Sequence, residues 1–135
     1  MSQLQPRILI YESYSGLQEA LKLILEETYH LSFESRPLHL RRAVTVTMPD
    51  LLLVDVDDQE SPFDFLASIR QQHSDLPILL IASEFSLAKQ LDGLRLEQVS
   101  FITKPFSREQ LSEKVATLIR GYSTQPLRRV VQIAY

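Results

Sequence analysis

Short apolar runs recur along this chain, and segments with the apolar spacing of amphipathic helices separate one run from the next. Runs of this length that are rich in aliphatic residues are typical of buried strands. Strict alternation of strands and helices indicates βα units on a parallel sheet. We therefore predict an α/β fold with five strands, at residues 7–11, 31–35, 51–55, 78–82 and 99–103.

Local start and stop signals divide the intervening segments into helices. Pro37 and Pro62 stand where helices begin, because the fixed φ of proline suits a first turn. Ser107 and Gln110 have the spacing of a capping box, and Gly121 is expected to end the last helix. The five predicted helices cover residues 17–25, 38–47, 62–73, 87–94 and 108–121.

Length and composition limit the class of protein. The chain has 135 residues, which is enough for one domain with a substantial core. We assign residues 1–122 to that domain and residues 123–135 to a linker or C-terminal tail. A net charge of −3 gives no electrostatic footprint for nucleic acid, and the absence of cysteine excludes disulfides and thiolate metal sites. No apolar stretch near the N-terminus is long enough for a signal peptide or membrane span, so a cytoplasmic location without membrane association is expected.

Three predicted strands lead to residues that can handle a phosphoryl group. Asp55 ends the central run, while Ser83 and Lys104 follow the next two runs. The carboxyl ends of parallel strands meet at one edge of the sheet, where ligands bind in open α/β folds. An aspartate can attack phosphorus, and a lysine can offset the charge that develops on the transferring oxygens. The three residues therefore predict a phosphoryl-handling site.

In these segments the chain resembles the receiver domain of response regulators in two-component signalling. The resemblance covers about residues 7–122. It implies a doubly wound (βα)5 parallel sheet of flavodoxin-like topology with strand order 2-1-3-4-5, and a cis bond between Lys104 and Pro105. The segments that carry it are Ile8–Glu12, Leu51–Asp55, Leu79–Ser83 and Phe101–Phe106.

The resemblance also implies a role for each residue of the predicted site. Asp55 would accept the phosphoryl group, Lys104 would be the cation beside it, and Ser83 would be the switch hydroxyl. Phe101 falls where the family has an aromatic residue that moves with this hydroxyl. Mg²⁺ is the implied cofactor. Its expected ligands are Glu12, Asp55 and Asp57.

Partners follow from the same resemblance. A sensor histidine kinase or a phosphotransfer protein would supply the phosphoryl group, and an output partner or effector domain would respond to it. Receiver domains commonly signal, and form homodimers, through a face built from the fourth helix, the fifth strand and the fifth helix. The residues that would contribute to that face here are Ala88, Leu91, Gly93, Phe101 and Arg108. Apart from catalysing its own phosphorylation and dephosphorylation, the domain is expected to have no enzyme activity.

Departures from the family pattern keep a second interpretation open. The family usually has two adjacent acids after the first strand, whereas Glu12 is followed here by Ser13, a weaker Mg²⁺ ligand. The loop after Asp55 lacks the usual methionine–proline pair and contains the further acids Asp57 and Asp58. We therefore expect weak metal binding and slow phosphorylation or none. The alternative is a degenerate receiver that acts as a phosphorylation-independent interaction module.

A third interpretation belongs to another class of protein. Residues 51–57 also resemble the nucleophile motif of haloacid-dehalogenase-type phosphohydrolases, in which Asp57 would be the general acid. That family needs an acidic pair for Mg²⁺ downstream of the lysine, and only Glu109 and Glu113 follow Lys104. Two complete strands also precede the motif, so this interpretation is the least favoured.

Overall fold

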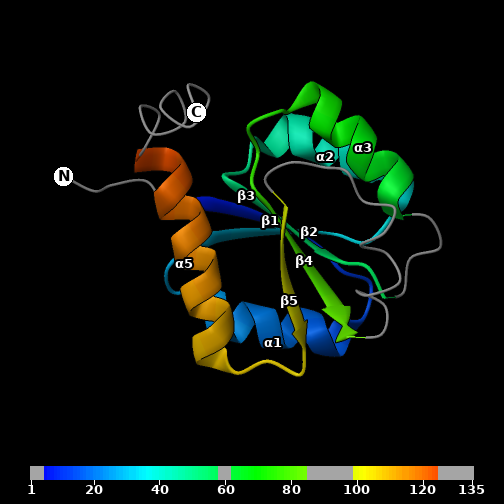
Figure 1. The fold of residues 1–135 in the computed structure, drawn as a ribbon. Coiled ribbons are helices and arrows are strands. Elements are labelled where there is room, and N and C mark those ends of the chain that lie inside the picture. Colours follow the sequence, from blue (N-terminus) through cyan, green and yellow to red (C-terminus); the bar gives the residue numbers. More distant parts are fainter. Residues whose placement is uncertain (1–4, 58–61, 85–98, 125–135) are drawn as a thin grey trace.

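The computed structural model of the protein describes residues 5–57, 62–84 and 99–124, and a five-stranded sheet forms its centre (Figure 1). All neighbouring strands pair in parallel. Their order is β2-β1-β3-β4-β5, which confirms the predicted doubly wound topology. The strands are β1 (Arg7–Tyr11), β2 (His30–Glu34), β3 (Leu51–Asp55), β4 (Ile78–Ser83) and β5 (Val99–Lys104).

Helices cover both faces of this sheet (Figure 1). On one face lie α1 (Ser15–Leu25) and α5 (Arg108–Thr124), and on the other lie α2 (Pro37–Thr47) and α3 (Pro62–Gln72). The helix predicted at residues 87–94 lies outside the described residues. None of the helices in the described ranges has the length and apolar composition that a membrane span requires.

The central strands are buried on both sides, which explains their nearly uninterrupted apolar sequences. Side chains of a strand alternate between the two faces of the sheet. In β3, Leu51 and Leu53 therefore belong to the core beneath α1 and α5, while Leu52 and Val54 belong to the core beneath α2 and α3. The same period places Asp55, the last residue of β3, on the side of α1 and α5.

The junction between β5 and α5 agrees closely with the predictions. The Ser107 hydroxyl accepts a hydrogen bond from the Gln110 amide at 3.0 Å, and the Gln110 side chain accepts one from the Ser107 amide at 2.8 Å. These reciprocal bonds confirm the capping box. The predicted cis bond between Lys104 and Pro105 is also present. Lys104 is the last residue of β5, and the capped helix begins at Arg108.

The C-terminal end of α5 differs from the prediction. The sequence predicts an end at Gly121, but the helix continues to Thr124, so this prediction is wrong. A glycine ends a helix by adopting a left-handed backbone, and no glycine in the described residues has a positive φ. The predicted boundary after residue 122 therefore falls within the last turn of α5.

Candidate functional site

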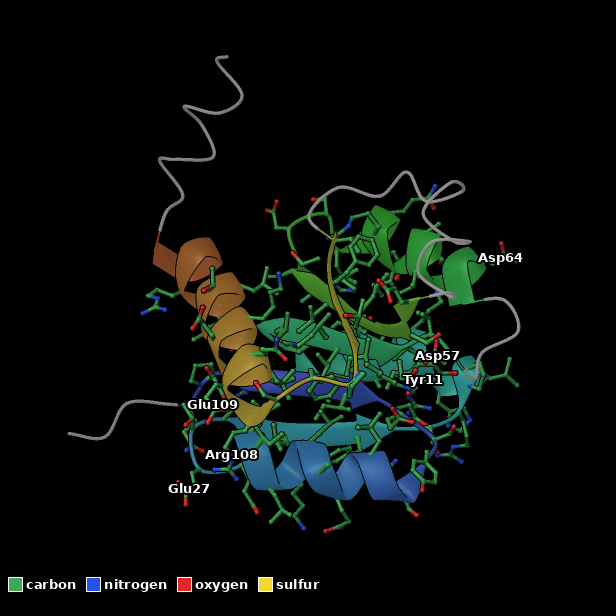
Figure 2. The ribbon with its side chains drawn as sticks, turned by 60° about the horizontal axis from the view of Figure 1, so that its bottom comes forward. Tyr11, Glu27, Asp57, Asp64, Arg108 and Glu109 are labelled. Carbon is green, nitrogen blue, oxygen red and sulfur yellow. The ribbon has the colours of Figure 1, made fainter. Side chains whose placement is uncertain are left out.

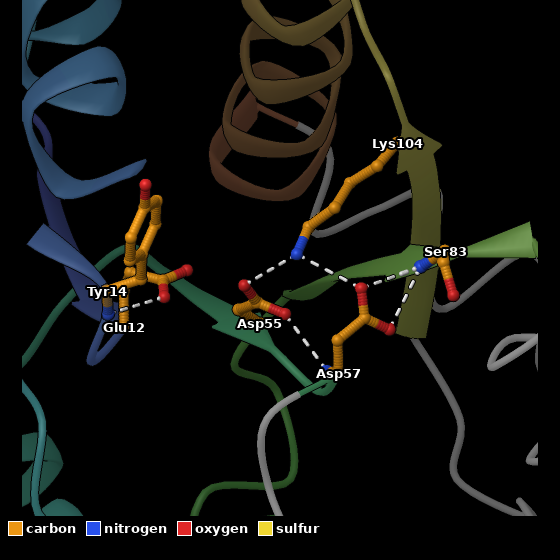
Figure 3. A network of polar contacts seen from close by, with 6 residues as sticks. All are labelled: Glu12, Tyr14, Asp55, Asp57, Ser83 and Lys104. Carbon is orange, nitrogen blue, oxygen red and sulfur yellow. Dashed lines mark hydrogen bonds and ion pairs between the residues drawn. The ribbon is translucent and has the colours of Figure 1, made fainter. Parts of the chain in front are cut away.

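The carboxyl ends of four strands bring the predicted site residues together (Figure 3). Glu12 follows β1, Asp55 ends β3, Ser83 ends β4, and Lys104 ends β5 directly opposite Ser83. All four lie in the row of their strand that faces α1 and α5, because the residues two positions earlier pack in the core on that side. Those core residues are Ile10, Leu53, Ile81 and Ile102.

Asp55 is a buried carboxylate with only 2% of its surface exposed. Its Oδ2 accepts a hydrogen bond from the Lys104 ammonium at 2.9 Å, and its Oδ1 accepts one from the Asp57 backbone amide at 3.0 Å. Burial of a charged group is costly unless the group is paired and hydrogen-bonded. The cation and the amide together meet that requirement, and they hold the carboxylate in a fixed orientation.

Lys104 contacts two carboxylates at nearly equal distances. Its Nζ lies 2.9 Å from Asp55 Oδ2 and 3.0 Å from Asp57 Oδ2. Burial by itself would lower the pKa of Lys104, but the hydrogen bonds to these two carboxylates raise that pKa above its ordinary value. The ammonium therefore stays charged at neutral pH, as the predicted role requires.

Asp57 makes contacts that the sequence did not reveal. Both of its carboxylate oxygens lie 3.0 Å from the backbone nitrogen of Ser83, so the amide donates to this carboxylate at the end of β4. With the ion pair to Lys104, these bonds connect the loop after β3 to the ends of β4 and β5 (Figure 3). The position of Asp57, two residues after Asp55, is the one sequence signal for its presence here.

Glu12 is the second buried acid of the site, with 1% of its surface exposed. Its Oε2 accepts a hydrogen bond from the Tyr14 amide at 3.0 Å. Its Oε1 is buried and receives no hydrogen bond from any residue that the structure describes. Burial and the nearby Asp55 carboxyl raise the pKa of Glu12 from 4.5 to about 8. A ligand carrying positive charge would stabilise the ionised form of this group.

The carboxyl groups of Glu12 and Asp55 fit a magnesium ion in part. The unsatisfied Oε1 of Glu12 suits a hard cation that keeps most of its water ligands. Asp57 is turned toward Lys104 and Ser83, and Ser13 is exposed. Within the described residues, no three histidine or acidic side chains come close enough together to form a metal site. The ligand role of Asp57 stays a prediction, and Glu12 and Asp55 are the two acids that fit the ion.

Phe101, the predicted switch aromatic, lies on β5 beside Leu80 of β4. Its side chain is partly buried against the core beneath α2 and α3. A groove of about 520 Å³ runs along β5 and α5 next to it. Residues from both elements line the groove, among them Phe101, Thr103, Gln110, Lys114 and Thr117. The switch role of Phe101 stays a prediction.

A scan against protein families finds a match that covers most of the chain. Residues 8–116 match the family model described as response regulator receiver domain, and the chain belongs to this family. Its function is that of a receiver domain of two-component response regulators. The match favours neither the phosphohydrolase interpretation nor the phosphorylation-independent module.

Curated relatives and solved structures agree with this assignment. The chain is 26% identical over 121 residues to the transcriptional regulatory protein BasR of Escherichia coli, a match that covers 88% of this chain and 54% of BasR. It therefore spans about half the length of the curated relatives that it matches. The N-terminal domain of the nisin resistance regulator NsrR is 29% identical with a TM-score of 0.71, covering 86% of this chain and 99% of that domain. A receiver domain from Bacteroides fragilis, at 23% identity and a TM-score of 0.75, covers 85% of this chain and 97% of its own and supports the fold.

Proposed function

We propose that Asp55 accepts a phosphoryl group and that this modification switches the binding of a partner. One observation carries the proposal: a buried carboxylate lies 2.9 Å from the Lys104 ammonium at the ligand-binding edge of a receiver fold. In the reaction, an Asp55 carboxylate oxygen attacks the phosphorus of the donor and forms a new P–O bond. The bond between phosphorus and the leaving group breaks, and its electron pair stays with the leaving group.

Charge compensation comes from groups already in place. Lys104 offsets the charge on the transferring oxygens, because its ammonium lies against the accepting carboxylate. A bound Mg²⁺ supplies further compensation, and Glu12 and Asp55 are the groups that fit it. Ser83, at the end of the neighbouring strand, supplies the switch hydroxyl, and Phe101 is the aromatic residue that moves with it.

The donor is a sensor histidine kinase or a phosphotransfer protein, in line with the family of the chain. Its relatives are named as transcriptional regulators, and the matches cover about half of their length. We assign residues 1–122 to the receiver and residues 123–135 to a linker or C-terminal tail, and an output partner or effector domain responds to the phosphorylated receiver. The domain acts in the cytoplasm, without contacting nucleic acid or membrane itself. Its only catalysis concerns its own phosphorylation and dephosphorylation.

The surface formed by β5 and α5 is the described part of the output face. The groove along these elements leaves a recess beside Phe101. Phe101 is paired with Leu80 of β4, so a shift of β5 relative to β4 would change how its side chain packs. An output partner, or a second copy of the chain, binds to this face. The helix predicted at residues 87–94 would complete the face, and it lies outside the described residues.

Intact mass spectrometry after incubation with acetyl phosphate and Mg²⁺ tests the phosphoacceptor. The wild type is expected to gain the mass of one phosphoryl group, and Asp55→Asn to gain none. Asp64→Asn is the matched control, because Asp64 is exposed at the start of α3 and points away from the sheet (Figure 2). Equal modification of Asp55→Asn and the wild type, or no adduct on the wild type at high Mg²⁺, would overturn the proposal.

A further inference from the structure

The Asp57 carboxylate occupies an anion-binding position within the candidate site. Both oxygens accept from the Ser83 amide at 3.0 Å, and Oδ2 also lies 3.0 Å from the Lys104 ammonium. Figure 3 shows this carboxylate between Asp55 and the end of β4. An ammonium and a backbone amide that converge on one carboxylate form a charge-assisted binding site for an anion.

A phosphoryl group on Asp55 needs the same donors. Three acceptor oxygens would be added to a carboxylate that already contacts Lys104 at 2.9 Å. Besides the Ser83 hydroxyl, the neighbouring strand ends present the Lys104 ammonium and the Ser83 amide as donors there, and Asp57 already binds both of these groups. The phosphoryl group also carries a charge of roughly −1.5 to −2 at neutral pH, and the neighbouring Asp57 carboxylate repels this negative charge.

We propose that Asp57 is an internal anionic ligand of the phosphoryl-binding site, and that it must leave Lys104 and Ser83 before Asp55 can be phosphorylated. This inference rests on the proposed function and adds a form of regulation to it. While Asp57 is bound, only the small fraction of molecules with a vacated site can react. The side chain is 18% exposed, so it has a route to solvent when it is displaced.

Two consequences distinguish this role from a merely structural contact. Replacing Asp57 should speed the modification of Asp55, whereas the loss of a structural contact would slow it or leave it unchanged. The vacated site should also bind a free anion at the Ser83 amide, even when no covalent bond forms. The second consequence does not depend on whether Asp55 reacts.

The first measurement is a titration with inorganic phosphate, followed by NMR through the Ser83 amide signal. Asp57→Ala and the isosteric Asp57→Asn are compared with the wild type, and Asp64→Asn is the control for the lost charge. The titration midpoint is expected to fall roughly tenfold in the Asp57 variants and to stay unchanged in the control. Equal midpoints for the wild type and a folded Asp57 variant would overturn the inference.

The second measurement is the rate of adduct formation with acetyl phosphate and Mg²⁺ by intact mass. The Asp57 variants are expected to react roughly tenfold faster than the wild type. Equal rates in the wild type and in the Asp57 variants, with an adduct in each, would overturn the inference and leave the proposed function intact. If no protein forms an adduct while the Asp57 variants bind phosphate more tightly, the anion site is upheld and the phosphoacceptor role of Asp55 fails.

Discussion

Glu12 and Asp55 are buried next to each other at the carboxyl ends of β1 and β3, which are neighbours in the sheet. Lys104 contacts Asp55, while the Glu12 carboxyl accepts the Tyr14 amide on one oxygen and, from the part of the chain that the structure describes, no hydrogen bond on the other. Burial and the nearby Asp55 carboxyl raise the pKa of Glu12, so this group keeps its proton to higher pH, and this predicts a specific pH dependence of stability.

Glu12→Gln is expected to remove a loss of stability that the wild type suffers as pH rises. Below pH 4.5 the Glu12 carboxyl is protonated in both the folded and the unfolded state. Between pH 4.5 and about 8 it is protonated mainly in the folded state, so the free energy of unfolding falls through this window. Glutamine does not ionise, so the free energy of unfolding of the variant should be about 2 kcal/mol higher than that of the wild type near pH 9.

Urea unfolding at about pH 5 and about pH 9, without Mg²⁺, measures this difference. Glu19→Gln is the matched control, because Glu19 is exposed on α1 and loses the same charge. The free energy of unfolding of Glu12→Gln should exceed that of the wild type by a small amount at the lower pH and by a large amount at the higher pH. An advantage of the same size at both values would show that Glu12 does not titrate between them.

Lys104→Ala is expected to destabilise the fold, because it leaves two neighbouring carboxylates without their shared cation. The cost should be about 2 kcal/mol, below that of a fully buried pair because the lysine side chain is 31% exposed. Chemical denaturation measures it, with the exposed Lys114→Ala on α5 as the control. If the pair with Asp57 contributes, the cost will differ in an Asp57→Ala background, and a cost identical in both backgrounds would contradict coupling of these residues.

Met48→Gly is expected to stabilise the protein by about 0.5–1 kcal/mol. Met48 directly follows α2 with φ 49°, a left-handed conformation that favours glycine, and its side chain is largely exposed. Little packing is therefore lost when the side chain is removed. Arg42→Gly, at an exposed interior position of the same helix, should have the opposite sign. Thermal or urea unfolding of Met48→Gly and Arg42→Gly, compared with the wild type, tests this prediction. The prediction is wrong if both substitutions destabilise the protein.

Strand periodicity makes much of the candidate site predictable from sequence. A polar residue two positions after a core residue emerges on the same side of the sheet, at its edge. The rule places Asp55 after Leu53 and Lys104 after Ile102, as the structure shows. The order of the strands does not follow from any local pattern. The strand order was predicted from the resemblance to a family, because the sequence of an apolar run does not determine which strand pairs with it.

The contacts of Asp57 could not be predicted from the sequence. Asp57 follows the end of β3, so the turn of the backbone there, and not the period of the strand, sets the direction of its side chain. The sequence predicts Asp57 as a metal ligand, a role that stays a prediction, and it does not indicate that Lys104 and the Ser83 amide bind this carboxylate. The prediction that α5 ends at Gly121 was wrong for a different physical reason. Glycine permits a left-handed backbone but does not require one, and the helix continues to Thr124.

The location of Asp57 outside both hydrophobic clusters has an evolutionary consequence. Its loop position fills no space in the core, whereas Asp55 and Glu12 are fully enclosed. A substitution at Asp57 changes the charge beside Asp55 without any repacking of the sheet. Related chains can therefore diverge in the charge beside Asp55 while they keep the same hydrophobic core.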